Sequence, residues 1–426
     1  MIGNNWISRD SAVSWHPYTQ MKSADEVLPV DKAEGIYIYD TSGNKYIDAV
    51  SSWWTNIHGH CHPYMIEKVT EQLKSLGHVM FAGITHPPAI ILAERLLNKI
   101  GHDHSRIFYS DDGSTAVEVA IKMALQYWRN KGTPRNKIIA LKNAYHGDTF
   151  GAMSVSERGV FTKPFYDQLF ETVFIEAPVR GNEEVCLLQL KNILGEAGVA
   201  AFIYEPMVQG AGGMIVHDAG SLKKMILMCQ KAGVITIADE VMTGFYRTGK
   251  LFASEHFGVF ADLICLSKGL TGGLFPMGVT SARSFIFDAF YDDDRAKAFF
   301  HGHSYTANPV ACAAALASLD LTEEKGFVEN VEKISELNLA FVEKLKLHPK
   351  VENPRTLGTI LAFEVKTVKN DGYLSEVNRG VFRYFLSKGI VLRPLGNVLY
   401  IMPPYCIKTE ELEYIYENIL SYLSDL

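Results

Sequence analysis

Three short apolar segments in the middle of the chain are each followed directly by residues that could do chemistry. Glu205 stands after the first segment, Asp239 and Glu240 after the second, and Ser267 and Lys268 after the third. Parallel strands bring their carboxyl ends to one edge of a sheet, which is where such sheets bind ligands. The sequence therefore predicts that these side chains share one site.

Lys268 is the candidate nucleophile. The apolar segment Leu263–Leu266 leads through Ser267 directly into Lys268 and Gly269. A lysine that loses hydration at the end of a strand has a lowered pKa, and its neutral amine can form a Schiff base with a carbonyl group. The alternative interpretation is an ordinary solvated lysine on a loop.

Asp239 is the candidate partner for a cation. It follows the apolar segment 234–238 and precedes Lys268 by 29 residues, about the length of one strand-and-helix unit. A buried carboxylate needs a positive partner, and the protonated ring nitrogen of pyridoxal phosphate is one such partner. A helix cap or a structural ion pair is the alternative.

Gly113 and Ser114 precede a helical segment over 116–128. The unpaired backbone N–H groups and the dipole at the start of a helix favour a phosphate, and glycine permits a close approach. The alternative is a plain helix start with a capping box between Thr115 and Glu118.

Of the remaining motifs, one suggests contact with a cofactor. Tyr145 follows an apolar segment, and its ring could stack on a flat cofactor or belong to the core. The stretch Gly244–Lys250 resembles a P-loop, but Leu251 stands where the metal-binding hydroxyl is needed. Gly210–Gly213 lacks the spacing of a dinucleotide-binding loop, and His58–His62 lacks zinc-site spacing, so we expect no bound metal.

The order of elements predicts an α/β fold. Short apolar runs recur about every thirty residues, with helix-like segments between several of them, as in βαβ units of a parallel sheet. The expected strands are 138–141, 173–175, 200–204, 234–238 and 263–266, and the expected helices include 115–128 and 221–231.

The two ends of the chain differ from this middle. A hairpin is expected over 36–47, and the last third should form strands at 359–365, 390–393 and 398–402 between helices 328–347 and 410–423. We therefore expect two domains. Residues 56–315 form a large α/β domain, and residues 316–426 form a small α+β domain, which the N-terminal segment and hairpin, 1–55, join.

Composition limits the functional classes. The 426 residues carry a net charge of −7, which argues against nucleic-acid binding. The six cysteines include no CxxC pair, as in proteins of a reducing compartment, and we expect a cytoplasmic protein. The uncharged stretch 75–93 contains glycine, histidine and proline residues, so a membrane span is not expected.

Together these motifs resemble the class III (ornithine-type) aminotransferases, which are pyridoxal-phosphate enzymes of fold type I. The signature is Ile237–Gly249, followed by Ser267–Gly269. Similarity extends over nearly the whole chain. Its other motifs are Trp15–Thr19, Ser51–Trp54, His78–His86, Tyr145–Gly151, Arg393–Pro394 and Tyr400–Pro404.

The resemblance implies how the cofactor is held. Lys268 would bind pyridoxal phosphate covalently and then move the substrate proton, and Asp239 would pair with the ring nitrogen. Gly113 and Ser114 would bind the phosphate, and Tyr145 would stack on the ring.

The resemblance also implies a substrate pocket. Tyr18, Trp53, Trp54 and Tyr145 would line it, with Tyr18 also counted among the catalytic residues. Arg393 would receive a substrate carboxylate, since its planar fork suits a bidentate pair.

A complete site would require a homodimer. Gly302, His303 and Ser304 would reach the phosphate and substrate region of the neighbouring subunit, with His303 and Ser304 as cofactor contacts and Gly302 as a substrate contact. The similar enzymes usually have Gly-Pro-Thr here; serine keeps the hydroxyl that a phosphate contact needs.

The activity implied is ping-pong transamination in biotin biosynthesis. S-adenosylmethionine would donate the amino group, and 7-keto-8-aminopelargonate would become 7,8-diaminopelargonate. The His-Ser loop also resembles relatives that use lysine, so lysine stays open as the donor. Two other readings stay open as well: a different class III ω-aminotransferase, and a nucleotide-binding or non-enzymatic α/β protein.

Overall fold

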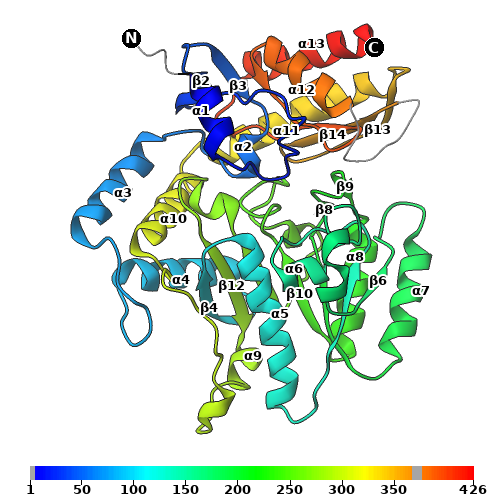
Figure 1. The fold of residues 1–426 in the computed structure, drawn as a ribbon. Coiled ribbons are helices and arrows are strands. Elements are labelled where there is room, and N and C mark those ends of the chain that lie inside the picture. The colour runs from blue at the N-terminus through cyan, green and yellow to red at the C-terminus, as the bar shows by residue number, and fades with distance from the viewer. Residues whose placement is uncertain (1–4, 367–376) are drawn as a thin grey trace.

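A seven-stranded sheet forms the centre of the protein, which is described here as a computed structural model covering residues 5–366 and 377–426 (Figure 1). The strand order is β4-β12-β11-β10-β7-β5-β6. The strands are β4 (His104–Ser110), β5 (Lys137–Leu141), β6 (Thr172–Ile175), β7 (Val199–Tyr204), β10 (Ile235–Asp239), β11 (Leu263–Leu266) and β12 (Gly278–Arg283).

The sheet is parallel except for one strand. β12 runs antiparallel to both of its neighbours, β11 and β4, whereas β10, β7, β5 and β6 pair in parallel. The five strands expected from apolar runs appear within one residue of their expected ends. The expectation of an α/β fold with a mostly parallel sheet is confirmed.

Helices cover both faces of this sheet, so its central strands are buried on both sides and read as continuous apolar runs. Alternate residues point to opposite faces. Ile237 packs in the cluster that includes helix α5 (Gly113–Asn130), and Tyr204 packs in the cluster that includes α8 (Ala219–Lys231). α7 (Glu183–Leu194) packs against α8 and β6.

Helix α5 begins with a different cap from the one considered from the sequence. Asp112 is the N-cap: its Oδ1 accepts the N–H of Thr115 at 2.7 Å, and Thr115 Oγ1 accepts the N–H of Asp112 at 3.1 Å. The pairing of Thr115 with Glu118 is therefore wrong. The Glu118 carboxylate instead accepts the N–H groups of Gly151 at 2.6 Å and Ala152 at 3.0 Å, which fixes the start of α6 (Phe150–Ser154) to α5.

The two chain ends meet above the sheet in the view of Figure 1. The N-terminal strands β1 (Val30–Glu34), β2 (Tyr37–Asp40) and β3 (Lys45–Asp48) form a four-stranded sheet with β15 (Ile390–Val391), which pairs in parallel with β3. A second sheet is antiparallel and contains β13 (Val351–Leu357), β14 (Ile360–Val365) and β16 (Val398–Ile401). Helices α11 (Phe327–Leu345), α12 (Val377–Ser387) and α13 (Thr409–Asp425) complete this part.

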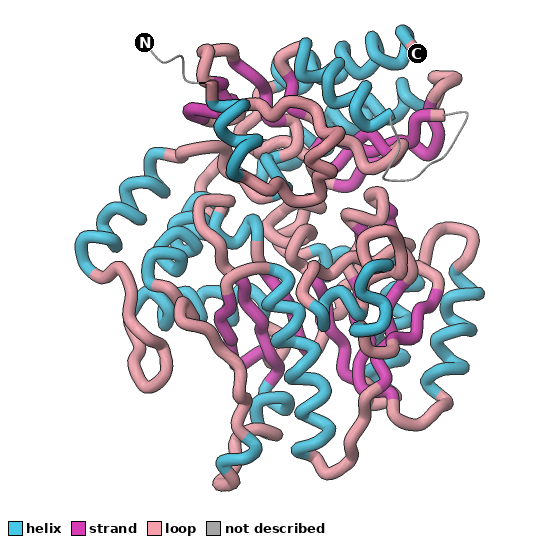
Figure 2. Tube along the Cα trace, viewed as in Figure 1, coloured by secondary structure: helices cyan, strands magenta, loops and turns pink. Residues whose placement is uncertain are grey.

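The remaining elements are short or lie at the side of the large sheet (Figure 2). They are α1 (Trp6–Val13), α2 (Ser51–Trp54), α3 (Pro63–Ser75), α4 (Pro87–Ile100), β8 (Val208–Gln209), β9 (Ile215–Val216), α9 (Ser284–Asp288), α10 (Pro309–Thr322) and the 3-10 turns η1 (Lys163–Gln168), η2 (Ala253–His256), η3 (Lys268–Thr271) and η4 (Arg295–Lys297). The domain limits stay a prediction, and the one expected between 315 and 316 falls within α10. No helix in the described ranges is long and apolar enough to cross a membrane.

Candidate active site

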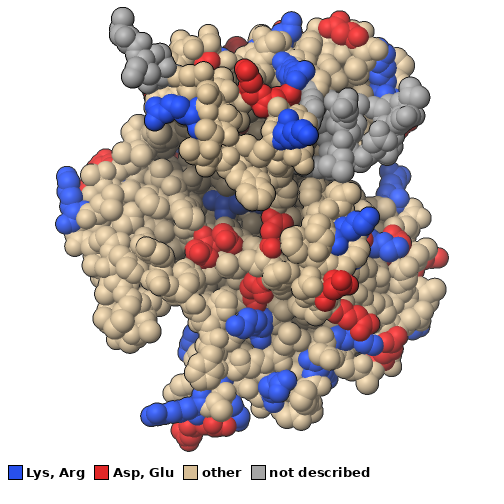
Figure 3. Space-filling model, in the orientation of Figure 1, with Lys and Arg blue, Asp and Glu red and all other residues tan. Residues whose placement is uncertain are grey.

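A cavity of about 620 Å³ opens beyond the carboxyl ends of β5, β7, β10 and β11. Figure 3 shows a hollow between the upper and lower parts of the molecule, with basic atoms deep inside and acidic atoms beside it. Eight residues predicted from the sequence line the cavity: Trp54, Gly113, Ser114, Tyr145, Glu205, Asp239, Ser267 and Lys268. Strand ends that are far apart in the sequence therefore do meet at one place.

Lys268 leaves β11 as the first residue of η3 and has a positive φ of 46°. Left-handed backbone is uncommon for a residue with a side chain and is often found at functional sites. Its Nζ lies 4.7 Å from the centre of a Trp54 ring and, within the described residues, has no hydrogen-bond or ion-pair partner. Burial lowers the pKa of Lys268 to about 8, although the carboxylates of Asp239 and Glu205 oppose this shift. A neutral amine is therefore readily available at the cavity.

Asp239 is fixed at the end of β10 by two contacts. Its Oδ2 lies 2.7 Å from Nδ1 of His146, and its Oδ1 accepts the N–H of Val241 at 3.1 Å. The backbone N–H of His146 donates to Ser156 Oγ at 2.9 Å. The role of His146 could not be read from the sequence, and the structure makes it the direct partner of Asp239. A carboxylate held in this way can accept a further positive group from the cavity.

Glu205, at the end of β7, also lines the cavity. Its two oxygens accept the N–H of Tyr145 at 3.1 Å and that of Gly210 at 2.9 Å. Burial raises the pKa of Glu205 to about 7, with Asp239 adding to the rise and His146 and the two N–H donors opposing it. The sequence predicted that Glu205 shares the site but assigned it no chemical task. Its position directly after an apolar strand was the signal that it belongs there.

The start of α5 lies at the cavity and is closely packed against its neighbours. A Cβ atom at Gly113 would lie 2.5 Å from Val241 Cγ1, and one at Gly147 would lie 2.2 Å from Ser114 Oγ, so neither position has room for a side chain. Ser114 Oγ contacts Thr149 Oγ1 at 2.8 Å and accepts the Thr149 N–H at 3.1 Å. An 18-residue helix that begins with Gly113 and Ser114 at a cavity offers the N–H groups and dipole that a phosphate needs.

Tyr18, Tyr145 and Asp148 share a hydrogen-bond cluster at the cavity. The Tyr145 hydroxyl donates to Asp148 Oδ2 at 3.0 Å and lies 3.0 Å from the Tyr18 hydroxyl, which also donates to Asp148. Burial and the bond with Tyr18 raise the pKa of Tyr145 well above its usual value. The sequence left the role of Asp148 open. The structure shows an exposed carboxylate held by two phenols.

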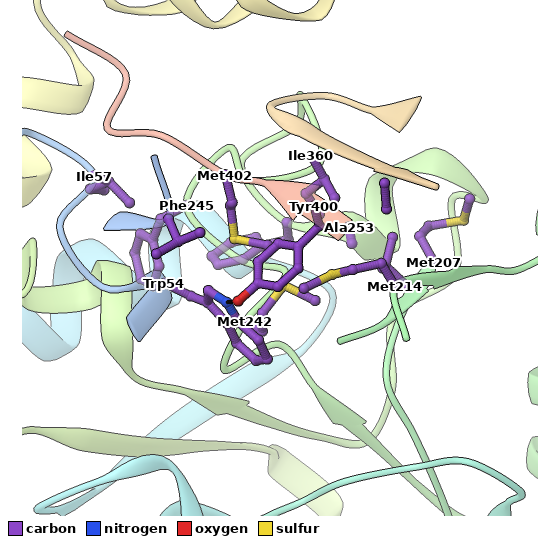
Figure 4. Close-up of a cluster of buried hydrophobic side chains, with 14 of the residues drawn as sticks. Trp54, Ile57, Met207, Met214, Met242, Phe245, Ala253, Ile360, Tyr400 and Met402 are labelled. Carbon is purple, nitrogen blue, oxygen red and sulfur yellow. Dashed lines mark hydrogen bonds between the residues drawn. The ribbon is translucent and has the colours of Figure 1, made fainter. Parts of the chain in front are cut away.

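We call Tyr18, Trp53 and Trp54 the aromatic wall. The Tyr18 and Trp53 rings are 5.6 Å apart, and Arg393 Cζ lies 5.5 Å from the centre of a Trp53 ring. Trp54 is buried: its Nε1 donates to the Tyr400 hydroxyl at 2.9 Å, and it packs with Met242 and other apolar side chains (Figure 4). Trp54 lines the cavity beside Lys268, whereas Tyr18, Trp53 and Arg393 contact one another outside the lining residues.

The loop with Gly302, His303 and Ser304 does not line this cavity within the described chain. The loop approaches a lining residue where His303 Nε2 lies 3.8 Å from Asp111 Oδ1. Gly302 and Ser304 are exposed. Their expected contacts in a neighbouring subunit stay a prediction.

Arg247 is fully buried behind Trp54 and does not line the cavity. Its guanidinium donates to the carbonyl oxygens of Trp54 at 3.3 Å and Pro403 at 3.1 Å, and to Thr359 Oγ1 at 3.4 Å. It also lies over the Tyr405 ring, with Cζ 4.9 Å from the ring centre. The stretch that resembled a P-loop therefore carries a structural arginine. In the described residues, no group of three or more potential ligands could hold a metal ion.

Comparison with known proteins decides the family. The family model described as "Aminotransferase class-III" matches residues 18–423. The chain belongs to the class III aminotransferases. This confirms the resemblance seen in the sequence motifs, and it excludes the nucleotide-binding and non-enzymatic readings.

Named relatives of this class III aminotransferase are similar over almost their full length. The adenosylmethionine-8-amino-7-oxononanoate aminotransferase of Synechococcus elongatus is 44% identical over 97% of this chain and 98% of its own. The enzyme of the same name from Staphylococcus aureus is 38% identical over 95% and 94%.

Solved structures agree with the fold. A crystal structure of adenosylmethionine-8-amino-7-oxononanoate aminotransferase from Methanocaldococcus jannaschii has a TM-score of 0.94 and 35% identity, and the match covers 99% of this chain and 98% of that one. An amine transaminase from an uncultivated Pseudomonas species, in its PLP-bound form, has a TM-score of 0.91 and 31% identity, with coverage of 96% and 98%. The expectation of fold type I is therefore confirmed.

Proposed function

We propose that this class III aminotransferase uses pyridoxal phosphate to convert 7-keto-8-aminopelargonate, also called 8-amino-7-oxononanoate, to 7,8-diaminopelargonate in biotin synthesis. The proposed amino donor is S-adenosylmethionine. The names of the relatives support the substrates. The observation that carries the chemistry is Lys268: a buried amine with a pKa of about 8 that faces a cavity beside the Asp239 carboxylate.

The residues at the cavity fit pyridoxal phosphate. Lys268 offers an amine for the aldehyde, Asp239 offers a carboxylate for the ring nitrogen, and Gly113 and Ser114 offer a helix start for the phosphate. Tyr145 provides an aromatic ring at the same cavity. When bound, the cofactor supplies an electron sink that makes a substrate C–H bond acidic.

Each group of this chain has one task in the proposed reaction. Nζ of Lys268 is the base that takes the proton from the substrate carbon and returns it, because burial favours its neutral form. Asp239 keeps a proton on the ring nitrogen through its negative charge, while His146 Nδ1 orients the carboxylate at 2.7 Å. The carbon skeleton of the substrate lies against the aromatic wall, which excludes water from the reacting atoms.

Two side chains of opposite charge, Arg393 and Asp148, suit the two substrates. Arg393, over Trp53, can bind the carboxylate of the keto acid in a bidentate pair. Asp148, with the Tyr18 and Tyr145 hydroxyls, can receive a positively charged group of the donor. Flat aromatic faces accept both an alkyl chain and an adenosyl group, so one pocket can serve both halves of a ping-pong reaction.

A homodimer is part of the proposal. The loops that carry Met80 and Tyr305 lie against each other, since the His78 and Tyr305 rings are 5.1 Å apart. Both side chains are exposed, Met80 by 61% and Tyr305 by 64%, next to the loop expected to reach a second subunit. Exposed apolar groups of this kind fit a protein interface. Sedimentation should give a dimer, and Tyr305→Asp should weaken it; a monomeric active enzyme would contradict this.

We also propose a cytoplasmic location. The six cysteines, all within the described residues, have free thiols. Unpaired cysteines are typical of a reducing compartment. Fractionation of cells that express the tagged chain would test this.

A single half-reaction tests the proposed function. Purified protein loaded with pyridoxal phosphate is mixed with S-adenosylmethionine alone, and the absorbance spectrum is recorded. Conversion of the yellow form to the pyridoxamine form would support both the cofactor and the donor. Conversion with lysine only would change the donor, and no conversion with either would contradict the substrate assignment.

A further inference from the structure

The two tryptophans of the aromatic wall stand on a strained stretch of backbone. Ser51, Ser52 and Trp54 all have positive φ, at 49°, 59° and 67°, although none is glycine. The strain sends neighbouring side chains in different directions: Trp54 is 5% exposed in the core, and Trp53 is 44% exposed beside Tyr18 and Arg393. Such a backbone persists only where the surrounding structure holds it in place.

The carboxylate of Asp48 holds this stretch through hydrogen bonds. It is the last residue of β3 and is fully buried, with 0% exposure. Its carboxylate accepts the N–H of Val50 at 3.2 Å and both the N–H and the hydroxyl of Ser52, at 2.6 and 3.1 Å. The fourth contact is Nε2 of His60, at 2.9 Å. One side chain therefore fixes the backbone directly before Trp53.

His60 extends the network around the other side of the tryptophans. Its Nδ1 lies 3.1 Å from Asn56 Nδ2, so it accepts that amide hydrogen and leaves Nε2 as the donor to Asp48. Asn56 Oδ1 accepts the Thr55 hydroxyl at 2.6 Å. Thr55 lines the cavity directly after Trp54. The hydrogen-bonded series Asp48–His60–Asn56–Thr55 thus contacts the strained segment both before and after the two tryptophans.

We propose that Asp48 and His60 are positioning residues that fix the aromatic wall and thereby set the affinity for both substrates. The role of the wall as a substrate surface rests on the proposed function. Neither residue lines the cavity, so each acts through the backbone between Ser51 and Asn56. Other contacts also hold the segment: Ser51 Oγ donates to the Met402 carbonyl at 2.8 Å, Trp54 Nε1 donates to the Tyr400 hydroxyl, and Arg247 donates to the Trp54 carbonyl at 3.3 Å.

Asp48→Asn tests this proposal, because it keeps the shape of the side chain but loses the charge and one acceptor oxygen. A displacement of about 1 Å far from the chemistry can cost about 100-fold. We expect KM for both substrates to rise by about 10- to 100-fold, with kcat much less affected. A folded variant whose KM values stay within about twofold of the original would overturn the proposal.

Asp262→Asn is the matched control. Asp262 is 5% exposed and also accepts an N–H and a hydroxyl from one residue, Thr236, both at 2.8 Å. It stands before β11, at the opposite end of the strand from Lys268. This variant should lose thermal stability without the change in KM. An equal rise in KM in both variants would show a general loss of stability and would overturn the positioning role.

His60 gives a second test if Asp48→Asn does not fold. His60→Ala removes the donor to Asp48 and should raise KM, while His60→Gln keeps an N–H donor and should restore most of the affinity. Failure of glutamine to restore it would count against the proposal.

Near-ultraviolet circular dichroism reads the tryptophans without any substrate. The His60→Ala and Asp48→Asn spectra should both change, and the Asp262→Asn spectrum should not. An unchanged Asp48→Asn spectrum would overturn the positioning role. If the variant spectra change but the unmodified protein gives no half-reaction, the positioning role stands and the proposed function is wrong.

Discussion

The floor of the cavity and its aromatic wall are built in opposite ways. We define the floor as Glu205, Asp239 and Lys268, which stand at the ends of three adjacent strands, β7, β10 and β11. The wall comes from Tyr18, Trp53 and Trp54, on irregular N-terminal backbone with positive φ at two of its three residues. The floor is positioned by the sheet itself, and the wall by side chains packed around it.

This difference matches a division of labour. The floor must hold charges at fixed places, and strand ends buried in a sheet are rigid enough to do so. The wall selects substrates, and loops can change without disturbing the sheet. Floor variants should therefore damage the reaction with either substrate, and wall or rim variants should damage binding, to different degrees for each substrate.

The largest expected effect is at Lys268. Lys268→Ala removes the only floor amine, so turnover should fall by more than about 10,000-fold. Steady-state rates with each substrate will measure this, with Lys224→Ala on the exposed face of α8 as the control. Retained turnover would mean that the floor does not do the chemistry.

The second effect is at Asp239. Asp239→Asn keeps the size of the side chain but removes the charge that faces His146 and the cavity, so we expect kcat to fall by about 100- to 1,000-fold and the cofactor to bind more weakly. Equal losses for both substrates would mark Asp239 as part of the floor. Asp262→Asn serves again as the control for stability, and a near-normal rate would contradict the assignment of Asp239.

The third effect separates the two substrates. Arg393→Ala breaks a pair with the carboxylate of the keto acid, which should cost about 2 kcal/mol or more, or at least about 30-fold in kcat/KM. Arg393→Lys keeps the charge without the planar fork and should recover only part of the loss. If the keto acid and the amino donor lose equally, or neither changes, Arg393 does not select the carboxylate.

The smallest effect concerns pH and the floor alone. Burial lowers the pKa of Lys268 from 10.5 to about 8, so its reactive neutral fraction rises about tenfold per pH unit below 8 and levels off above it. The rate at which protein without cofactor takes up pyridoxal phosphate, followed by absorbance, should rise and level off in the same way. A profile that keeps rising to pH 10 would show an ordinary exposed lysine.

The lowered pKa of Lys268 also determines how the stability of the cofactor-free protein changes with pH. A lysine whose folded pKa is lowered destabilises the cofactor-free protein below about pH 8, and this cost disappears as pH rises toward 10.5. Lys268→Met should therefore raise the melting temperature of the cofactor-free protein at pH 7, with a smaller gain at pH 10. An equal gain at both pH values would contradict the buried, titrating lysine.

The floor could be predicted from the sequence, because apolar strands that end in charged residues follow a general rule of parallel sheets. β7, β10 and β11 are buried on both faces, so they read as continuous apolar runs. Only the family resemblance pointed to Trp53 and Arg393 as neighbours. Their contact depends on the pairing of β3 with β15, between residues more than three hundred positions apart, which local patterns do not encode.

Two strands of the central sheet escaped prediction for a physical reason. β12 has the sequence Gly-Val-Thr-Ser-Ala-Arg. The strand is buried because neighbouring elements cover it, although it has few large apolar side chains. Thr280 Oγ1, for example, donates to the Ala116 carbonyl in the core. β4 contains His104, whose ring contacts Ser281 Oγ and the Ala261 carbonyl. A buried strand whose polar side chains are hydrogen-bonded inside the fold does not appear as an apolar run in the sequence.

Arg247 has a consequence for how the molecule comes apart. Its guanidinium joins the carbonyl of Trp54, near the N-terminus, to Pro403 and Thr359, in the C-terminal part. If either end of the chain unfolded alone, the buried Arg247 guanidinium would lose oxygen acceptors, which is strongly unfavourable. The two ends and the central sheet should therefore unfold in one cooperative step, and amide hydrogens near Trp54 and Pro403 should exchange at the same slow rate as those of the sheet.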